Sequence, residues 1–296
     1  MINNLIIKTS YSRLKDGSLK SNFGDLLRST SLSSCLNNDF RWLTDSRALP
    51  LLKWFMDSHR LIVVDADIKD YGLSENTNIY NIDNYICDSD MFVQGSGAWH
   101  GYIRNGRGDI IPENDLIRCI EPYSGLDCAI SWQEALIRGM GFEWHEQDYS
   151  ASNAPAFEVM YDIGFNWHVH PEWESKKWNE KLWRNLEEAL SPPLSVSWQQ
   201  GVNDLDEYVH WISSCSLIVT CDTLGLHLAS ALRKKVVAIV GVTDCHEYSY
   251  GRVFFVRPER SDCMPCNMPV CRYGKTCLDS VPVESVARTV FEVLKK

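Results

Sequence analysis

The sequence predicts an α/β protein in two halves, each a parallel sheet with helices packed on it. Short apolar, β-branched runs alternate with stretches of helical periodicity, which is the pattern of such layers. The alternation is clearest from Ser216 to Gly241, SLIVTCDTLGLHLASALRKKVVAIVG, which reads as strand, polar turn, helix and strand. A polar run of small residues, Tyr149–Pro155, marks a linker. We therefore expect two Rossmann-like domains, at residues 1–150 and 156–296.

The first half has the less regular pattern. Strands are expected at Leu5–Ile7, Trp42–Thr44 and Leu61–Asp65. Helices are expected from Asp25 through Leu32, after Thr44, and at Asn114–Ile120 and Trp132–Met140. From Asp70 to Arg107 polar and aromatic residues follow no clear period, so no element is predicted there.

The second half alternates regularly. Besides Ser216–Gly241, strands are expected at Tyr161–Asn166, Leu194–Trp198 and Arg252–Val256. Helices are expected at Lys177–Leu190, which Pro192-Pro193 terminates, at Leu205–Ser213 and at Pro282–Leu294.

Composition narrows the possible functions. The 296 residues are 45% hydrophobic and carry a net charge of −10, with no Lys/Arg-rich run, which disfavours nucleic acid and anionic membranes as partners. No apolar run approaches the roughly 18–20 residues of a membrane helix, and the N-terminus lacks a signal-peptide core. We expect a cytoplasmic protein, whose 11 cysteines are mostly free thiols or metal ligands.

A polar turn, Asp222-Thr223-Leu224-Gly225-Leu226-His227, lies where an apolar strand meets a helix N-terminus. In open α/β sheets ligands bind at the carboxyl ends of strands, and helix N–H groups there hold phosphate. Thr223 and the following N–H groups are therefore candidates for binding a diphosphate. The alternative is ordinary capping by Asp222 or Thr223, with His227 as a polar filler.

Two further segments carry candidate charges. Lys176, in Ser175-Lys176-Lys177-Trp178, follows a strand and suits a phosphate; the alternative is a solvated helix turn. Asp25 begins a helix after a glycine-containing loop and suits a general base, or else a helix cap. Trp167, Trp173 and Trp178, near Lys176 in the sequence, suit either stacking on a base or sugar or core packing.

Four cysteines gather near the C-terminus. Cys263, Cys266, Cys271 and Cys277 lie within fifteen residues, interrupted by Pro and Gly. Four thiolates suit a tetrahedral structural site for Zn or Fe. The spacing is not that of a zinc ribbon, so unliganded thiols on a packed loop stay the alternative.

Taken in order, these motifs resemble glycosyltransferase family 9, the family of the ADP-heptose:lipopolysaccharide heptosyltransferases. The resemblance rests on Gly24-Asp25 before an apolar helix, Lys176-Lys177-Trp178, Asp222-Thr223 with His227-Leu228-Ala229, and Gly241-Val242-Thr243. Many members also carry a similar cysteine cluster. The resemblance is densest over residues 161–294.

The resemblance implies a GT-B architecture, with two Rossmann-like domains facing a central cleft and the nucleotide-sugar donor held mainly by the second. It implies inverting transfer without a catalytic metal, usually of heptose from ADP-heptose. Asp25 would then be the general base, while Lys176, Asp222, Thr223, Leu224, Gly225 and His227 would form the donor site. The sequence leaves the acceptor open among a lipid-linked or other glycan, a protein and a small metabolite, and a lipid-linked acceptor would bring the enzyme to the inner membrane.

One departure and two alternatives remain. Family members usually have glycine directly after Asp-[Ser/Thr], whereas Leu224 stands here and Gly225 follows. A non-catalytic nucleotide-sugar-binding or metal-sensing protein on the same scaffold is one alternative, although such a binder needs no base at Asp25. A sugar-nucleotide epimerase is the other, and the acid/base pair that it needs is not evident in the sequence.

Overall fold

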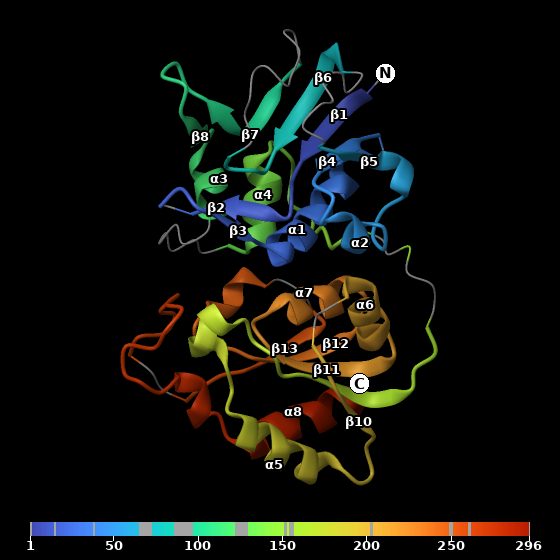
Figure 1. Ribbon diagram of the computed structural model, residues 1–296, viewed down its shortest axis with the longest axis vertical. Coiled ribbons are helices and arrows are strands. Elements are labelled where there is room, and N and C mark those ends of the chain that lie inside the picture. Colours follow the sequence, from blue (N-terminus) through green and yellow to red (C-terminus); the bar gives the residue numbers. More distant parts are fainter. Residues whose placement is uncertain are drawn as a thin grey trace. The chain divides into compact units, whose positions relative to one another are not determined.

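The computed structural model describes residues 2–14, 16–37, 39–64, 73–85, 97–121, 130–150, 153, 157–201, 204–248, 251–259 and 262–295. The chain forms two compact units, Met1–Asn153 and Ala154–Lys296, each with its own sheet (Figure 1). In the expected linker, residues 151, 152, 154 and 155 lie outside the described residues, as does Asp65 at the end of an expected strand. The α/β fold class predicted from the sequence is confirmed.

The first unit has a six-stranded sheet in the order β5-β4-β1-β6-β7-β8. Its strands are β1 (Ile2–Ile7), β4 (Arg41–Thr44), β5 (Leu61–Val63), β6 (Leu73–Asn81), β7 (Trp99–Arg104) and β8 (Ile110–Pro112). All neighbours are parallel except β7 and β8. The parallel strands thus follow the Rossmann order, in which the chain reverses its direction of progress between β1 and β6.

The helices of this unit are short. They are α1 (Phe23–Ser29), α2 (Leu49–Leu52), α3 (Asp115–Cys119) and α4 (Trp132–Gly139), with 3₁₀ turns η1 (Thr30–Leu36) and η2 (Ser58–Arg60). The helix expected from Asp25 through Leu32 changes to 3₁₀ at Thr30. The hydroxyls of Ser29 and Thr30 donate to carbonyls three or four residues back, which competes with α-helical geometry.

A two-stranded antiparallel hairpin, β2 (Tyr11–Arg13) and β3 (Leu19–Ser21), separates β1 from α1. The backbone N–H of Asn22 donates to the carbonyl of Ser10 at 2.7 Å, which closes the base of the hairpin. The hairpin therefore returns the chain to the end of β1, where α1 begins.

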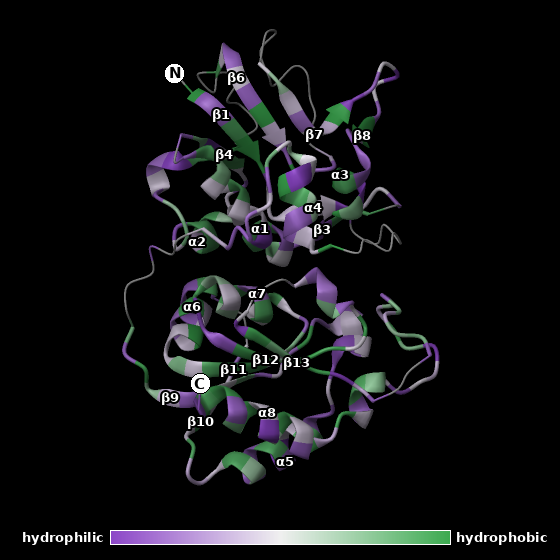
Figure 2. Cartoon of the chain, turned by 180° about the vertical axis from the view of Figure 1, so that it is seen from behind, coloured by the Kyte–Doolittle hydropathy of each residue, from purple (hydrophilic) through white to green (hydrophobic). Residues whose placement is uncertain are grey.

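The second unit has a five-stranded parallel sheet in the order β10-β9-β11-β12-β13. Its strands are β9 (Tyr161–Asn166), β10 (Val196–Trp198), β11 (Cys215–Cys221), β12 (Lys235–Ile239) and β13 (Val253–Val256). This is the other common doubly wound order, flavodoxin-like, and its switch point lies between β9 and β11. Figure 2 shows apolar residues along β11 and β12, as their central position requires.

Helices cover both faces of this sheet. Figure 1 shows α5 (Glu180–Leu190) and α8 (Val283–Lys295) on one face and α6 (Leu205–Ser213) and α7 (Leu224–Ala231) on the other. The helix expected from Lys177 begins at Glu180, because Asn179 caps it by accepting from the N–H of Lys181. Trp178 precedes that helix and is fully buried against Trp183, so it packs in the core.

The remaining chain-wide features concern membranes and cysteines. None of the helices that the structure describes is long and apolar enough to cross a membrane. Eight cysteines in the described ranges are thiols, and Cys119 is disulfide-bonded.

Candidate functional site

The switch point of the second unit brings together the ends of β9 and β11. Asn166 ends β9 and lies opposite Thr220 of β11 in the strand register. Two residues further on, Asp222-Thr223 leads directly into α7. The polar residues predicted from the sequence therefore lie in the crevice where doubly wound folds bind ligands.

Thr223 is the N-cap residue of α7, but its side chain does not cap the helix. Its hydroxyl oxygen instead accepts a hydrogen bond from Asn166 Nδ2 at 2.8 Å. Leu224 and Gly225 are the first helical residues, and N–H groups at that position have no carbonyl partner within the helix. This helix end thus has donors available for an anion.

Asp222 is buried and points toward Lys176 rather than toward the helix end. One carboxylate oxygen forms an ion pair with Lys176 Nζ and accepts from Thr243 Oγ1 at 2.6 Å. The other oxygen accepts from the Tyr248 hydroxyl. The expected alternative of capping by Asp222 is therefore not what its side chain does.

The contacts of Asp222 also control its ionisation. Burial alone would raise the pKa of Asp222, but the charges of Lys176 and His227 and the hydrogen bonds from Lys176 and Thr243 outweigh burial. The pKa of this carboxyl lies well below its usual range, so it is ionised at neutral pH. Lys176 is thereby held at the crevice, where its Nζ also lies 4.3 Å from the ring centre of Trp173.

His227 lies in the first turn of α7 and is 5% exposed. Its ring centre is 5.7 Å from that of Tyr248, the tyrosine that donates to Asp222. His227 thus lies near the contacts of Asp222, and its charge helps to lower the pKa of that carboxyl. The sequence analysis includes Thr243 in a Gly-x-Thr motif, whereas Asn166 and Tyr248, which contact Thr223 and Asp222, were not predicted as site residues.

Asp25 lies in the first turn of α1 in the other unit and is 7% exposed. Its Oδ1 pairs with Arg28 and its Oδ2 accepts from Asn22 Nδ2, while the Asn22 side chain caps the helix by accepting from the Asp25 N–H. Arg28 in turn lies 4.5 Å from the ring centre of Trp132. A carboxylate has about four lone-pair directions, so both oxygens retain capacity to accept a further proton donor.

A buried ion pair fixes the chain leading to Asp25. Lys8, just after β1, pairs with Asp83, just after β6, at 2.6 Å, and the Thr9 N–H donates to the same carboxylate at 2.8 Å. Ser10 is held by Asp45, which follows β4. The switch point of this unit is thus filled by its own side chains, and these contacts anchor the base of the hairpin that precedes α1.

The four clustered cysteines are near one another, but no three of their sulfurs lie within 4.8 Å of one another. Burial, and then the neighbouring thiols Cys266, Cys263 and Cys271, raise the pKa of Cys277. Among the described residues, the only His, Cys, Asp or Glu group with three ligand atoms within 4.8 Å of one another is Asp244-Cys245-His246. A tetrahedral thiolate site needs sulfurs ~3.8 Å apart, given metal–sulfur bonds of ~2.3 Å. The donor chemistry fits a soft metal, and the loop would have to contract to bind it.

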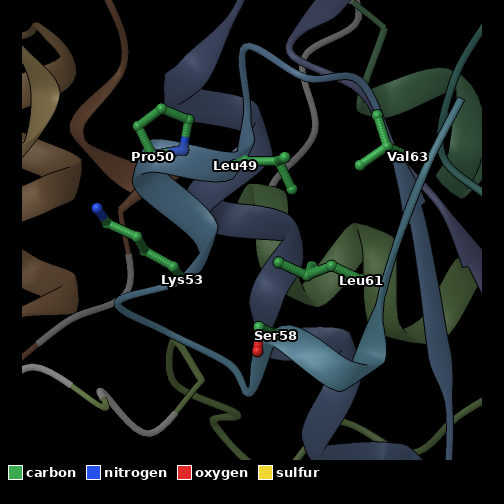
Figure 3. A pocket seen from close by; sticks show the side chains of 6 residues that line it. All are labelled: Leu49, Pro50, Lys53, Ser58, Leu61 and Val63. Carbon is green, nitrogen blue, oxygen red and sulfur yellow. The ribbon is translucent and has the colours of Figure 1, made fainter. Parts of the chain in front are cut away.

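A separate hollow of about 420 Å³ lies beside α2 and β5 in the first unit (Figure 3). Its lining is mostly apolar and consists of Leu49, Pro50, Lys53, Ser58, Leu61 and Val63. It contains none of the residues that the sequence predicted to act on a ligand.

Comparisons with known proteins relate part of this chain to a glycosyltransferase family. The sequence model of glycosyltransferase family 9 (heptosyltransferase) matches residues 201–275, which include Asp222–His227. No curated protein sequence matches the chain. The match confirms the predicted resemblance to family 9 and the prediction of a glycosyltransferase.

Solved structures match over nearly the whole chain. E. coli heptosyltransferase WaaC with ADP-2-deoxy-2-fluoro heptose has a TM-score of 0.61 at 14% identity, covering 98% of this chain and 99% of that one. E. coli ADP-heptose lps heptosyltransferase II has a TM-score of 0.63 at 14% identity, covering 99% and 98%. The dodecameric iron-containing heptosyltransferase TibC, in complex with ADP-D-beta-D-heptose, has a TM-score of 0.62 at 14% identity, covering 99% and 77%. These likenesses confirm the GT-B fold.

Proposed function

We propose that this chain is an inverting glycosyltransferase that needs no catalytic metal and moves a sugar from a nucleoside diphosphate to an acceptor hydroxyl. Heptose from ADP-heptose is the donor we favour, because WaaC and TibC are described with ADP-linked heptoses. The observation that carries the proposal is the β9/β11 switch point, where Thr223 and the first N–H groups of α7 are available to an anion.

In this proposal the second unit binds the leaving group. The Thr223 hydroxyl and the N–H groups of Leu224 and Gly225 donate to the diphosphate, and Lys176 contributes a positive charge at the same edge. Asp222 and His227 position Lys176 and the turn. Fixed donors and a lysine neutralise the charge that develops on the departing diphosphate, which is the task a divalent metal performs in other transferases.

Asp25 is the proposed general base, and it takes the proton from the acceptor hydroxyl as that oxygen attacks the anomeric carbon. Arg28 and Asn22 hold its carboxylate in place, one on each oxygen. The same contacts suit a purely structural helix-start residue, which is what the alternative of a non-catalytic nucleotide-sugar-binding protein requires. Substitution of Asp25 therefore separates the two readings.

For the acceptor we propose a glycan on a lipid or on a protein, reached from the cytoplasm. The basis is the structural likeness to the E. coli ADP-heptose lps heptosyltransferase II.

We also propose that Cys263, Cys266, Cys271 and Cys277 bind a structural Fe or Zn ion. The proximity of Cys277 to the other three thiols and the iron content of TibC support this. Elemental analysis of protein prepared without an affinity metal should find about one metal ion per chain, which Cys277→Ser should abolish. Cys35→Ser should leave it unchanged, and a metal-free wild type would contradict the proposal.

The donor site is tested by calorimetric titration with ADP, UDP, GDP and CDP. The wild type should bind one of them best, and Thr223→Val should weaken that nucleotide about 10- to 100-fold, the cost of one hydrogen bond to a charged group. Thr289→Val is the matched control, because Thr289 is also half-buried but donates to Ser285 on α8. A wild type that binds none of the four nucleotides would refute the proposed donor site.

A further inference from the structure

A buried asparagine contacts Thr223, the residue proposed to donate a hydrogen bond to the diphosphate. Asn166 is 1% exposed, and its Nδ2 donates to both Thr220 Oγ1 at 2.7 Å and Thr223 Oγ1 at 2.8 Å. Its Oδ1 accepts from the hydroxyl of Tyr208, on α6, at 2.7 Å. Every hydrogen-bonding direction of the amide except one oxygen lone pair is therefore used.

The neighbouring groups fix which way the amide faces. Thr220 spends its own proton on the carbonyl of Cys221 at 2.8 Å, so Thr220 Oγ1 can only accept from Asn166. The NH₂ group must then lie on the threonine side, and Tyr208 must donate to Oδ1. Burial raises the pKa of Tyr208, which keeps its hydroxyl protonated and able to donate.

This arrangement determines the role of the Thr223 hydroxyl. Its oxygen accepts from Asn166 and does not cap α7, so its proton is left to donate. The Thr223 hydroxyl oxygen lies 3.4 Å from Thr220 Oγ1, which is longer than an ordinary O–H···O bond. A phosphate oxygen, which only accepts, is the partner that suits it.

We propose that Asn166 and Tyr208 are positioning residues that hold Thr223 as a hydrogen-bond donor toward the diphosphate of the sugar donor. The inference rests on the proposed function, since it concerns the hydrogen bonds from Tyr208 to Asn166 and from Asn166 to Thr223 at that same site. A threonine left to rotate presents a lone pair to the phosphate in some of its orientations, which is repulsive. Asn166 covers that lone pair, and Tyr208 prevents the amide from turning over.

The test is a double-mutant cycle on nucleotide affinity, using whichever of ADP, UDP, GDP and CDP binds the wild type best. Asn166→Ala should weaken binding about 10-fold in the wild-type background and less than 2-fold in Thr223→Val. Tyr208→Phe leaves the asparagine in place and should weaken binding about 2- to 5-fold, again only where Thr223 is present. Asn179→Ala is the control, because it removes the cap of α5 and should leave affinity unchanged.

The outcomes separate the two proposals. A wild type that binds no nucleotide overturns both. If Thr223→Val weakens binding but Asn166→Ala has no effect, or the same effect in both backgrounds, the positioning role is refuted and the donor site stands. If Asn166→Ala does not fold, the Tyr208→Phe cycle decides by the same criterion.

Discussion

The two units place different chemistry at the same topological position. In the first, the switch point between β1 and β6 is filled by Lys8 and Asp83, which are 2% and 0% exposed and satisfy each other. In the second, the neutral amide of Asn166 donates to Thr223 at the switch point between β9 and β11, and among the residues that the structure describes no side chain caps the N-terminus of α7. A doubly wound sheet thus offers the crevice, and the side chains at the strand ends decide whether it anchors the chain or accepts a ligand.

The carboxylates at the two positions differ in the same way. Asp83 is paired with one lysine inside the protein, and burial raises its pKa above the usual value. Asp222 is paired with Lys176 and also receives two hydroxyl hydrogen bonds, and its pKa is lowered. The surroundings of Asp83 therefore disfavour its charged form, whereas those of Asp222 stabilise it as an anion beside the crevice.

The largest expected effect is a loss of turnover without a loss of donor affinity, because the two units have different proposed roles. Asp25→Asn should lower the turnover of the sugar donor about 10²- to 10⁴-fold while leaving donor affinity nearly unchanged, because the base acts only on the acceptor hydroxyl. Release of nucleoside diphosphate in the presence of acceptor measures turnover, and calorimetry measures donor affinity.

A matched control for that variant exists in the same unit. Asp115 also follows an asparagine cap, begins a helix and pairs with an arginine three residues later, at 3.2 Å. Asp115→Asn should leave turnover unchanged. Equal turnover in Asp25→Asn and the wild type would exclude Asp25 as the general base, whereas a wild type that binds the donor but shows no turnover would favour the non-catalytic binding protein.

The next effect tests the anchoring role of the first switch point. Lys8→Met leaves the Asp83 carboxylate buried without its cation and should lower the free energy of unfolding by about 3–5 kcal/mol. The double variant Lys8→Met/Asp83→Leu should recover most of that loss, because neither charge is then buried. Urea unfolding gives both values.

The surface pair Glu134–Arg138, at 3.0 Å, serves as the control for the buried pair. Arg138→Met should cost less than about 1 kcal/mol, since exposed ion pairs contribute little. A loss of that small size in Lys8→Met would contradict the anchoring role.

A smaller effect tests how closely α7 packs on the second switch point. A Cβ at Gly225 would overlap Asn166 Nδ2 and the Tyr208 hydroxyl at distances that real Cβ atoms do not show. Gly225→Ala should therefore destabilise the protein by about 1–3 kcal/mol and displace the amide, although alanine normally favours a helix. Thermal unfolding and nucleotide affinity should both fall.

Gly251→Ala provides the comparison, because nothing lies within 4 Å of a Cβ at that position. It should be neutral or slightly stabilising. Equal thermal stability and nucleotide affinity in the two variants would show that the space between Gly225 and Asn166 can accommodate a methyl group.

How much of this was predictable depends on whether a residue's partners are near it in sequence. Asp222–His227 was found because the strand, turn and helix are contiguous. Strands β6, β7 and β8 were missed, since β6 reads LSENTNIYN and its polar residues hide the alternation until Ile79. Thr77 is fully buried there, and its hydroxyl donates to the Ile2 carbonyl, across 75 positions of sequence.

The same reasoning explains which site contacts escaped the sequence analysis. Asn166, Tyr208 and Thr223 lie on β9, α6 and at the start of α7, and their hydrogen bonds span 42 and 57 positions. The ion pair that neutralises Lys176 spans 46 positions. In the pairing of β9 with β11, Asn166 lies beside Thr220. A correct prediction of that strand register would therefore have placed Asn166 at the site.

The smallest expected effect is an opposite pH dependence at the two switch points. The folded-state pKa of Asp222 is lowered, so its stabilising contribution is present above the unfolded value of about 3.9 and is lost as the pH falls below it. The folded-state pKa of Asp83 is raised, so its contribution is present below about 3.9 and declines as the pH rises through the folded value.

The free energy lost in Asp222→Asn should therefore shrink as the pH is lowered from about 6 to about 3, and the loss in Asp83→Asn should grow. Urea unfolding of both variants and the wild type across that range measures the two slopes, and slopes of the same sign would mean that the two crevices do not differ electrostatically as the structure indicates.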